Sequence, residues 1–341
     1  MSSKIRVLVV DDSAFARKVL RDVLMASAEI EVVGIARDGL EALEKVADLK
    51  PDVITLDLIM PNLDGLGVLD ALAPSGPRVV VVSTADGESE LAIRALERGA
   101  VELVTKPTAL ATDRMYELGA ELLRKVKSAA QARVQPWPSP LPSAAPQREP
   151  IRTSRKIVAI GTSTGGPQAL TSLLCALPAN FPVPIVVALH IPPGYTRALA
   201  QRIDASSRLT VVEAEQGMEL RPGLAAIAQG GSHLTLHLRD QHFVCEIGRE
   251  PGDTLLFPSV DVLFESVVRV AGGATMGVVL TGMGDDGMRG AGTIRRAGGV
   301  VLTQSAASCV VYGMPRCVVE AGDSDGEAPL ASMAELMLAR L

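Results

Sequence analysis

Short apolar runs alternate with amphipathic patterns along the N-terminal part of the chain. The runs are typical of buried strands and lie at residues 6–10, 31–36, 52–57, 79–83 and 101–105. Ser13 is the expected N-cap of the first helix, and an apolar stripe from Leu40 to Ala47 predicts the buried face of the next. Repeated strand–helix units predict a parallel sheet with helices on both faces. We therefore expect a doubly wound, flavodoxin-like domain over residues 4–127.

A proline-rich segment interrupts this alternation between Gln135 and Pro150. It contains six prolines and almost no apolar periodicity. Because proline fixes φ and favours extended backbone, we expect a semi-rigid spacer rather than part of a core. Residues 128–154 are assigned to an interdomain linker.

The alternation resumes at Arg155. Strands are expected at residues 156–161, 184–190, 210–214, 276–282 and 299–303, and helices at residues 169–177, 196–203, 260–270 and 289–297. Residues 223–247 alternate differently: two runs within them, LTLHL and HFVCEI, are separated only by residues 239–241 and predict an antiparallel hairpin. The second domain, residues 155–341, is therefore expected to be α/β, with a mainly parallel sheet and a β-hairpin insertion.

Composition and charge narrow the class of protein. Hydrophobic residues make up 48% of the chain and charged residues 21%, as in globular proteins. The net charge of −6 offers no basic footprint for nucleic acid or an anionic membrane. No apolar stretch approaches the roughly 20 residues that span a bilayer, and the N-terminus is not of the signal-peptide type. We expect a cytoplasmic protein with reduced cysteines, no nucleic-acid partner and no membrane insertion.

Charged residues follow several expected strands of the first domain. They are Asp11, Asp12, Asp57 and Lys106. The carboxyl ends of parallel strands lie along one edge of a sheet, where such folds place their sites. Crowded carboxylates repel one another unless a cation joins them, and oxygen ligands suit Mg²⁺. Asp12 alone fits a helix N-cap equally well, but the whole pattern is suited to hold a phosphoryl group on a carboxylate.

This domain resembles the receiver domain of response regulators. The resemblance is carried by DDS (11–13), DLIMPNLDG (57–65) and TKP (105–107), and it covers almost all of residues 4–127. It implies that Asp57 accepts phosphate from a histidine kinase. It also implies that Asp11 and Asp12 bind Mg²⁺ together with Asp57.

The same resemblance assigns roles to the other polar residues of this edge. Lys106 is expected to contact the phosphoryl group. Ser83 is the expected switch hydroxyl, and Thr84 is close enough in register to remain a candidate. By the same analogy, the bond between Lys106 and Pro107 is an expected cis peptide.

In the second domain, the stretch KIVAIGTSTGGP at residues 156–167 predicts a strand that ends in a Gly-rich turn before a helix. Ser163 lies in this turn between Gly161 and Gly165, which is the pattern of a nucleophile elbow, where small neighbours leave a serine exposed. Dinucleotide-binding loops share this pattern. An oxidoreductase of that kind would need an acidic residue roughly 20 positions later at a strand end, and residues 180–190 contain none. The nucleophile is the favoured interpretation.

A serine nucleophile needs a base and an acid that orients it. Of the four histidines, His190 ends a strand at the same predicted edge as Ser163. His233 and His237 are four residues apart, but they lie on a predicted strand, where this spacing does not make a metal pair. Three carboxylates qualify as the acid by position, namely Asp261, Asp285 and Asp286.

These segments resemble the catalytic domain of the CheB family of chemotaxis methylesterases. The resemblance is carried by GTSTGGP (161–167), HIPPGYT (190–196), PSVDVLFES (258–266), LTGMGDDG (280–287) and SCVVYGMP (308–315). It implies a nucleophile at Ser163, a histidine at His190 and an aspartate at Asp286. Two positions depart from the family pattern, because Asp285 stands where asparagine is frequent and Phe257 stands where arginine is usual.

The resemblance implies a protein-glutamate methylesterase. We hypothesise that Ser163 attacks methylated glutamates of chemoreceptors with release of methanol, and that glutamines are deamidated by the same route. N–H groups near Thr164 and Met283 are the candidates for the oxyanion hole. No cofactor is expected at the esterase site.

The upstream receiver implies regulation by a chemotaxis-type histidine kinase. A receiver packed over the esterase edge would block a large substrate until charge at Asp57 shifted the packing equilibrium. The rival hypothesis is a receiver-regulated binding module that has lost activity. The joint presence of Ser163, His190 and Asp286 argues against that rival.

Overall fold

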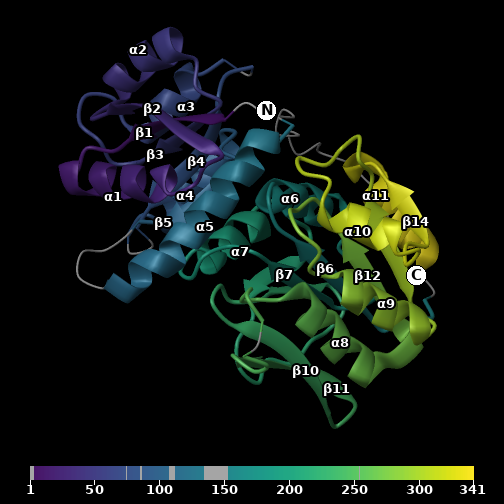
Figure 1. Cartoon of the computed structure of the whole chain (residues 1–341). Coiled ribbons are helices and arrows are strands. Elements are labelled where there is room, and N and C mark those ends of the chain that lie inside the picture. Colours follow the sequence, from purple (N-terminus) through teal and green to yellow (C-terminus); the bar gives the residue numbers. More distant parts are fainter. Residues whose placement is uncertain (1–3, 74, 85–86, 107–111, 134–152, 253) are drawn as a thin grey trace. The chain divides into compact units, whose positions relative to one another are not determined.

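The protein consists of two units of structure (Figure 1). The computed structural model describes residues 4–73, 75–84, 87–106, 112–133, 153–252 and 254–341. The units comprise residues 1–137 and 138–341, and each is described by itself. In the described part of the chain, no helix is long and apolar enough to cross a membrane.

The first unit is a five-stranded parallel sheet with the strand order β2-β1-β3-β4-β5. Its elements are β1 (Ile5–Val10), α1 (Ala14–Met25), β2 (Ile30–Ala36), α2 (Gly39–Leu49), β3 (Val53–Leu56), α3 (Gly65–Ala71), β4 (Arg78–Ser83), α4 (Ser89–Glu97), β5 (Glu102–Thr105) and α5 (Thr112–Gln131). The predicted doubly wound fold is confirmed. The chain reverses its direction of winding between β1 and β3, and such a switch point is where open α/β sheets bind ligands.

The sequence predicted the start of α1 better than the buried face of α2. Ser13 caps α1 as predicted, because its side chain accepts a hydrogen bond from the backbone N–H of Ala16. The face predicted for α2 is only partly right: Leu43 and Val46 are half-buried, but Leu40, at 53%, and Ala47 are exposed, and the fully buried positions are Gly39 and Ala42. The helix packs through small residues, Gly39 and Ala42, which an apolar stripe of larger residues does not reveal.

The end of the first unit differs from the predicted boundary. Helix α5 continues to Gln131, so the first residues assigned to the linker are helical. Residues 134–152 of the proposed linker lie outside the described residues, as does Pro107 with its expected cis bond.

The second unit contains a seven-stranded parallel sheet with the order β14-β13-β12-β6-β7-β9-β8. Its elements are β6 (Ile157–Thr162), α6 (Gly166–Ala176), β7 (Ile185–Leu189), α7 (Thr196–Asp204), β8 (Thr210–Glu213), β9 (Leu224–Ile227), β10 (His233–Arg239), β11 (His242–Gly248), α8 (Val260–Ala271), η1 (Gly272–Ala274), β12 (Thr275–Val279), α9 (Met288–Arg296), β13 (Val300–Gln304), α10 (Met314–Glu320), β14 (Gly326–Ala328) and α11 (Leu330–Arg340). The α/β fold and its antiparallel hairpin, β10 with β11, are confirmed.

Several short elements of this unit escaped prediction. Strand β9 lies in the region assigned to the hairpin, but it joins the main sheet in parallel with β7 and β8. Its sequence, LAAI, has too few β-branched residues to stand out. Strand β14 has only three residues. It lies, with helices α10 and α11, in the C-terminal region after residue 303, where we predicted no elements.

The central strand of the second sheet is β6, and all six of its residues are buried. It is flanked by β7 on one side and β12 on the other. Because all three strands are parallel, their carboxyl ends open at one edge of the sheet. Figure 1 shows the hairpin projecting from the unit beside α8.

Candidate active site

Ser163 directly follows β6, at the turn into α6. Its N–H donates to the carbonyl of Thr281 (3.0 Å), and its carbonyl accepts from the N–H of Gly166 (2.7 Å). Gly165 carries the turn with a φ of +74°, which favours glycine, and a Cβ there would lie 2.6 Å from Val310. The serine is only 4% exposed, so the exposed position expected of an elbow serine is wrong. The positive φ belongs to Gly165 and not to the serine.

The strands beside β6 bring the other candidates to Ser163. His190 directly follows β7, and its N–H donates to the carbonyl of Thr162, the last residue of β6 (3.1 Å). The loop after β12 contains Thr281, whose carbonyl accepts the N–H of Ser163. The convergence of three strand ends, predicted from the sequence, is therefore present.

The imidazole of His190 is paired with Asp286. Its Nε2 lies 2.8 Å from Oδ2 of the carboxylate, and both side chains are largely buried. A carboxylate that accepts this bond assigns the proton to Nε2. The lone pair is then on Nδ1, which is buried and has no hydrogen-bond partner among the described residues. The free nitrogen of His190 is available to accept a proton.

The carboxylate of Asp286 is bonded at both oxygens. Oδ1 accepts from Ser259 Oγ (2.9 Å) and from the N–H of Asp261 (2.9 Å). Oδ2 accepts from His190 and from the N–H of Val260 (2.7 Å). Burial by itself would raise the pKa of Asp286, but His190 and these backbone N–H groups outweigh it and lower the pKa. Asp286 is held as a fixed anion at the N-terminus of α8.

The other two acid candidates occupy different places. Asp285 is exposed at the surface of the loop. The Asp261 carboxylate accepts from the N–H groups of Gly287 (3.0 Å) and Gly290 (2.7 Å). Burial, with the nearby charge of Asp286, raises the pKa of Asp261 to about 6. Of the three carboxylates, Asp286 is the one whose hydrogen bond to His190 fits an orienting acid.

The backbone on either side of the serine is tightly packed. Thr164 is 1% exposed, and its carbonyl accepts from the hydroxyl of Thr281 (3.0 Å). Gly282 lies against the nucleophile, because a Cβ at this position would be 2.8 Å from Ser163 Cβ. Met283 is the next residue. Thr164 therefore borders Ser163 in sequence, and Met283 follows the glycine that lies against it; the role of both as oxyanion donors stays a prediction.

Sequence reasoning missed two residues that hold the acid in place. Ser259 is the N-cap of α8 and also donates to Asp286. His233 is 1% exposed and accepts the N–H of Ser259 on Nδ1 (3.1 Å), while Nε2 lies 3.2 Å from the carbonyl of Pro251. Burial lowers the pKa of His233. A serine before an apolar helical run was a readable N-cap signal, but nothing in the sequence linked His233 to it.

Phe257, which departs from the family pattern, packs on His233. The two ring centroids are 4.6 Å apart. The guanidinium of Arg249 also lies over the Phe257 ring, 5.7 Å from the ring centroid. A cation is thus present near this position, supplied from the end of the hairpin.

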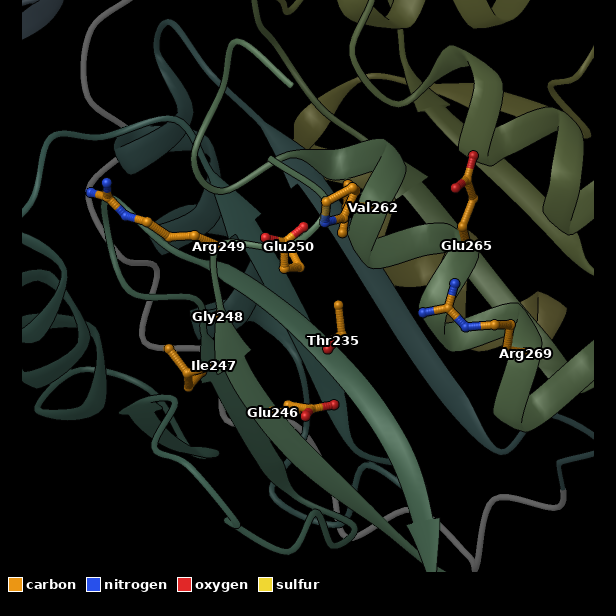
Figure 2. A pocket seen from close by; sticks show the side chains of 10 residues that line it. Thr235, Glu246, Ile247, Gly248, Arg249, Glu250, Val262, Glu265 and Arg269 are labelled. Carbon is orange, nitrogen blue, oxygen red and sulfur yellow. The ribbon is translucent and has the colours of Figure 1, made fainter. Parts of the chain in front are cut away.

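A cavity of about 550 Å³ lies between the hairpin and α8 (Figure 2). Thr235 and Glu246 border it from the strands, and Glu265 and Arg269 border it from the helix. None of Ser163, His190 and Asp286 lines it. This cavity is therefore separate from the serine and its partners.

The carboxylates of the first unit gather at the switch point of its sheet. Asp11 and Asp57 are almost fully buried, and each lies within reach of Lys106, whose Nζ is 3.0 Å and 2.8 Å from them. Asp12 is exposed, and ligand oxygens of the three aspartates lie within 4.8 Å of one another. The predicted cluster is therefore present, with one lysine for three acidic groups.

Charge in this cluster is only partly compensated. Burial raises the pKa of Asp57 to about 6, against the hydrogen bond from Lys106 that lowers it. Burial also raises the pKa of Asp11. Carboxylates that resist ionisation in a confined group are suited to a divalent cation, which would compensate the remaining charge.

The predicted switch hydroxyl points to a carboxylate from α4's N-terminus. Ser83 Oγ donates to Glu88 (2.6 Å), and the N–H of Thr84 donates to the same oxygen (3.0 Å). The backbone of Ser83 is next to the cluster, since its carbonyl accepts the N–H of Lys106 (2.7 Å). The backbone of Ser83 is thus bonded to that of Lys106, the lysine that contacts Asp57, whereas the hydroxyl of Ser83 is bonded to Glu88.

Comparison with known proteins identifies the family. Residues 158–337 match the family described as CheB methylesterase, and residues 7–115 match the response regulator receiver domain. A protein-glutamate methylesterase/protein-glutamine glutaminase 5 of Myxococcus xanthus is 59% identical over 98% of this chain and 97% of its own. A protein-glutamate methylesterase/protein-glutamine glutaminase of Thermotoga maritima is 42% identical over 98% of each. The crystal structure of the Thermotoga maritima CheB methylesterase catalytic domain has a TM-score of 0.54 and 40% identity, covering 55% of this chain and 99% of that one.

These matches define a response regulator with an enzymatic output domain. The chain belongs to the CheB methylesterase family. Both resemblances read from the sequence are confirmed, together with the hydrolase class of the family.

Substituting Gly282 with alanine is expected to impair the serine. The new Cβ would lie 2.8 Å from Ser163 Cβ and 3.1 Å from its backbone nitrogen, so the turn must shift. We expect Ser163 to react at least roughly tenfold more slowly with a serine-directed fluorophosphonate, with a loss of about 1–3 kcal/mol in the free energy of unfolding. Gly248→Ala, where a Cβ meets nothing within 4 Å, is the control. Equal labelling rates in both variants would contradict the close approach.

Asp57→Asn is expected to stabilise the metal-free protein increasingly between pH 4 and pH 7. The folded pKa of Asp57 is raised from 3.8 to about 6, so the folded state binds this proton more tightly than the unfolded chain. The wild type therefore loses roughly 1–3 kcal/mol of stability as the pH rises through this window. The asparagine variant lacks this loss.

Urea denaturation in EDTA, at several pH values, measures this difference. The exposed Asp22, which pairs with Arg21, provides the control variant Asp22→Asn. A stability difference between wild type and Asp57→Asn that is constant from pH 4 to pH 7 would show that burial does not raise the pKa of Asp57.

Proposed function

We propose that this chain is a phosphorylation-activated protein-glutamate methylesterase that hydrolyses glutamate methyl esters on chemoreceptors. The observation that carries the proposal is the buried His190–Asp286 pair beside Ser163, with the free imidazole nitrogen unpartnered among the described residues. Two relatives that align over nearly the whole chain bear the name protein-glutamate methylesterase/protein-glutamine glutaminase.

The reaction begins with proton transfer to the free nitrogen of His190. Ser163 Oγ turns toward Nδ1 and gives up its proton as it attacks the ester carbonyl. In unliganded enzymes this hydrogen bond is frequently not yet formed. The carbonyl oxygen becomes an oxyanion, which N–H groups near Thr164 and Met283 stabilise.

The tetrahedral intermediate then collapses. His190 returns the proton to the leaving oxygen, so that methanol departs and a glutamyl ester of Ser163 remains. Water attacks this ester with His190 again as the base, which regenerates the serine and leaves a free glutamate carboxylate. A glutamine side chain follows the same path with ammonia as the leaving group.

Asp286 orients the imidazole and stabilises its protonated form. Its four hydrogen bonds keep it ionised and fixed, so Nε2 retains the proton while Nδ1 acts. The low-dielectric surroundings of this buried pair strengthen the effect.

Regulation is assigned to the carboxylate cluster of the first unit. Asp57 is the phosphoryl acceptor from a chemotaxis-type histidine kinase, and Asp11 and Asp12 would hold Mg²⁺ together with it. The all-oxygen donor set and the raised pKa of Asp57 fit such an ion. When bound, Mg²⁺ neutralises the charge of the phosphoryl oxygens. Lys106 contacts the phosphoryl group.

The switch hydroxyl completes this arrangement. Ser83, bonded to Glu88 in the described structure, leaves that partner for the phosphoryl group on Asp57. Thr84 is the second candidate for the same role. The resulting change in the receiver raises the rate of the esterase. The protein is proposed to act in the cytoplasm on the cytoplasmic parts of receptors.

The catalytic assignment predicts a strong effect of Ser163→Ala. Methanol release from methylated receptor fragments should fall by at least roughly 10³-fold, because no other group supplies the nucleophile. Ser206→Ala, an exposed serine of the same unit, is the control. A Ser163→Ala variant with full methanol release would refute the assignment, and failure of wild type to label with a fluorophosphonate would favour an inactive binding module.

The regulatory assignment predicts activation by acetyl phosphate with Mg²⁺. Methanol release should increase by at least several-fold in the wild type, and EDTA or Asp57→Asn should abolish the increase but leave the basal rate. Rates are measured with the same receptor fragments. Equal rates with and without the phosphodonor would refute gating, whereas the catalytic assignment would survive.

A further inference from the structure

The N-termini of helices α8 and α9 are capped by each other's carboxylates. Asp286, two residues before α9, accepts from the N–H groups of Val260 and Asp261 at the start of α8. Asp261 in turn accepts from the N–H groups of Gly287 and Gly290 at the start of α9. The two helices therefore cap each other reciprocally: the carboxylate beside each helix start accepts N–H groups from the start of the other helix.

We propose that Asp261 is a positioning residue for the esterase reaction, because its carboxylate fixes the loop from which Asp286 reaches His190. The inference rests on the proposed function for its reaction and on the hydrogen bonds for its mechanism. Asp261 does not contact His190 or Ser163 in any hydrogen bond of the described residues, so it acts through Asp286.

The contacts place Asp261 next to the acid on two sides. Its own N–H binds Oδ1 of Asp286 (2.9 Å), while its carboxylate binds the N–H of Gly287, the residue that directly follows Asp286. Asp261 thus binds both the carboxylate of Asp286 and the N–H of the peptide bond that follows Asp286. Removing the Asp261 carboxylate leaves two backbone N–H groups without their acceptor and releases one of these two restraints.

Charge explains why two carboxylates are tolerated here. Asp261 is 15% exposed at its side chain and lies 3.8 Å from Arg289, which pairs more closely with Glu265 (2.8 Å). Each carboxylate also faces the positive end of a helix dipole. Burial and the charge of Asp286 nevertheless raise the pKa of Asp261 to about 6, so this anion is maintained at a cost in free energy.

Three variants of the full chain test the proposal. Asp261→Ala removes the acceptor, and Asp261→Asn keeps one acceptor oxygen but removes the charge. The matched control is Asp325→Asn, a carboxylate of the same unit that is 16% exposed, accepts the N–H of Val301 (2.9 Å) and pairs with Arg295. Methanol release is measured on acetyl phosphate-treated protein, as kcat, KM and their pH dependence, alongside the rate of fluorophosphonate labelling of Ser163.

The proposal predicts a distinct pattern. Asp261→Ala should lower kcat and the labelling rate by roughly 10–100-fold, with KM changed less than threefold, because misplacing a catalytic group affects turnover more than binding. Asp261→Asn should recover most of this loss. The charged groups that face Asp261 are Asp286 and Arg289. Without the Asp261 charge, the acidic limb of the kcat/KM profile should move to lower pH in Asp261→Asn, and Asp325→Asn should not move it.

Other results would overturn the proposal. If Asp261→Ala and Asp325→Asn lower kcat and labelling equally, Asp261 is only structural. If Asp261→Ala fails to fold, Asp261→Asn decides, because its neutral oxygen is a weaker acceptor for the same N–H groups: a kcat, a labelling rate and an acidic limb that all equal those of wild type would refute the proposal. Should wild type label normally but release no methanol, the proposed function fails, whereas the labelling rates of the variants still test Asp261.

Discussion

The carboxylate of Asp286 accepts four hydrogen bonds on its two oxygens, and the geometry of the catalytic unit depends on them. Three donors come from residues 259–261 at the start of α8, and the fourth is His190. The N-terminus of α8 therefore binds an anion, in addition to the packing of its buried face. Because the imidazole of His190 binds the same anion, the position of α8 constrains the position of this imidazole. Any shift of this helix would move His190 relative to Ser163.

The parallel sheet determines where the remaining parts meet. Ser163 follows the central strand β6, His190 follows β7, and the acid loop follows β12, so neighbouring strands deliver all three groups to one edge. The backbone is closely packed at this edge, because there is no space for a Cβ at Gly282 beside Ser163. The hairpin adds a support from outside the sheet through His233, which holds the N–H of Ser259. The site thus depends on buried polar contacts as much as on the sheet.

Alternating apolar runs located most strands of both units to within a few residues, and strand-end chemistry located Ser163, His190 and the carboxylate cluster of the first unit. Residue types alone could not choose among Asp261, Asp285 and Asp286, because all three were expected near the same sheet edge and the choice depends on which carboxylate meets Nε2 of His190. The engagement of Ser83 with Glu88 was equally hidden, since it depends on a rotamer. Strand β9 was missed because its alanine-rich sequence has little strand propensity of its own. It is a strand because it pairs with β7 and β8.

The two units use buried carboxylates in opposite ways, and the number of donors explains the difference. Asp57 has one lysine and one backbone N–H, Leu58, to offset its burial, and its pKa rises to about 6. Asp286 has four donors, and its pKa falls. An incompletely compensated carboxylate gains most from a further positive charge, whereas a saturated one gains little. The first arrangement suits a residue whose charge state is to change when a ligand or phosphoryl group arrives. The second suits a carboxylate that stays ionised, and the loop that carries it is bound in turn by Asp261, whose carboxylate accepts the N–H groups of Gly287 and Gly290.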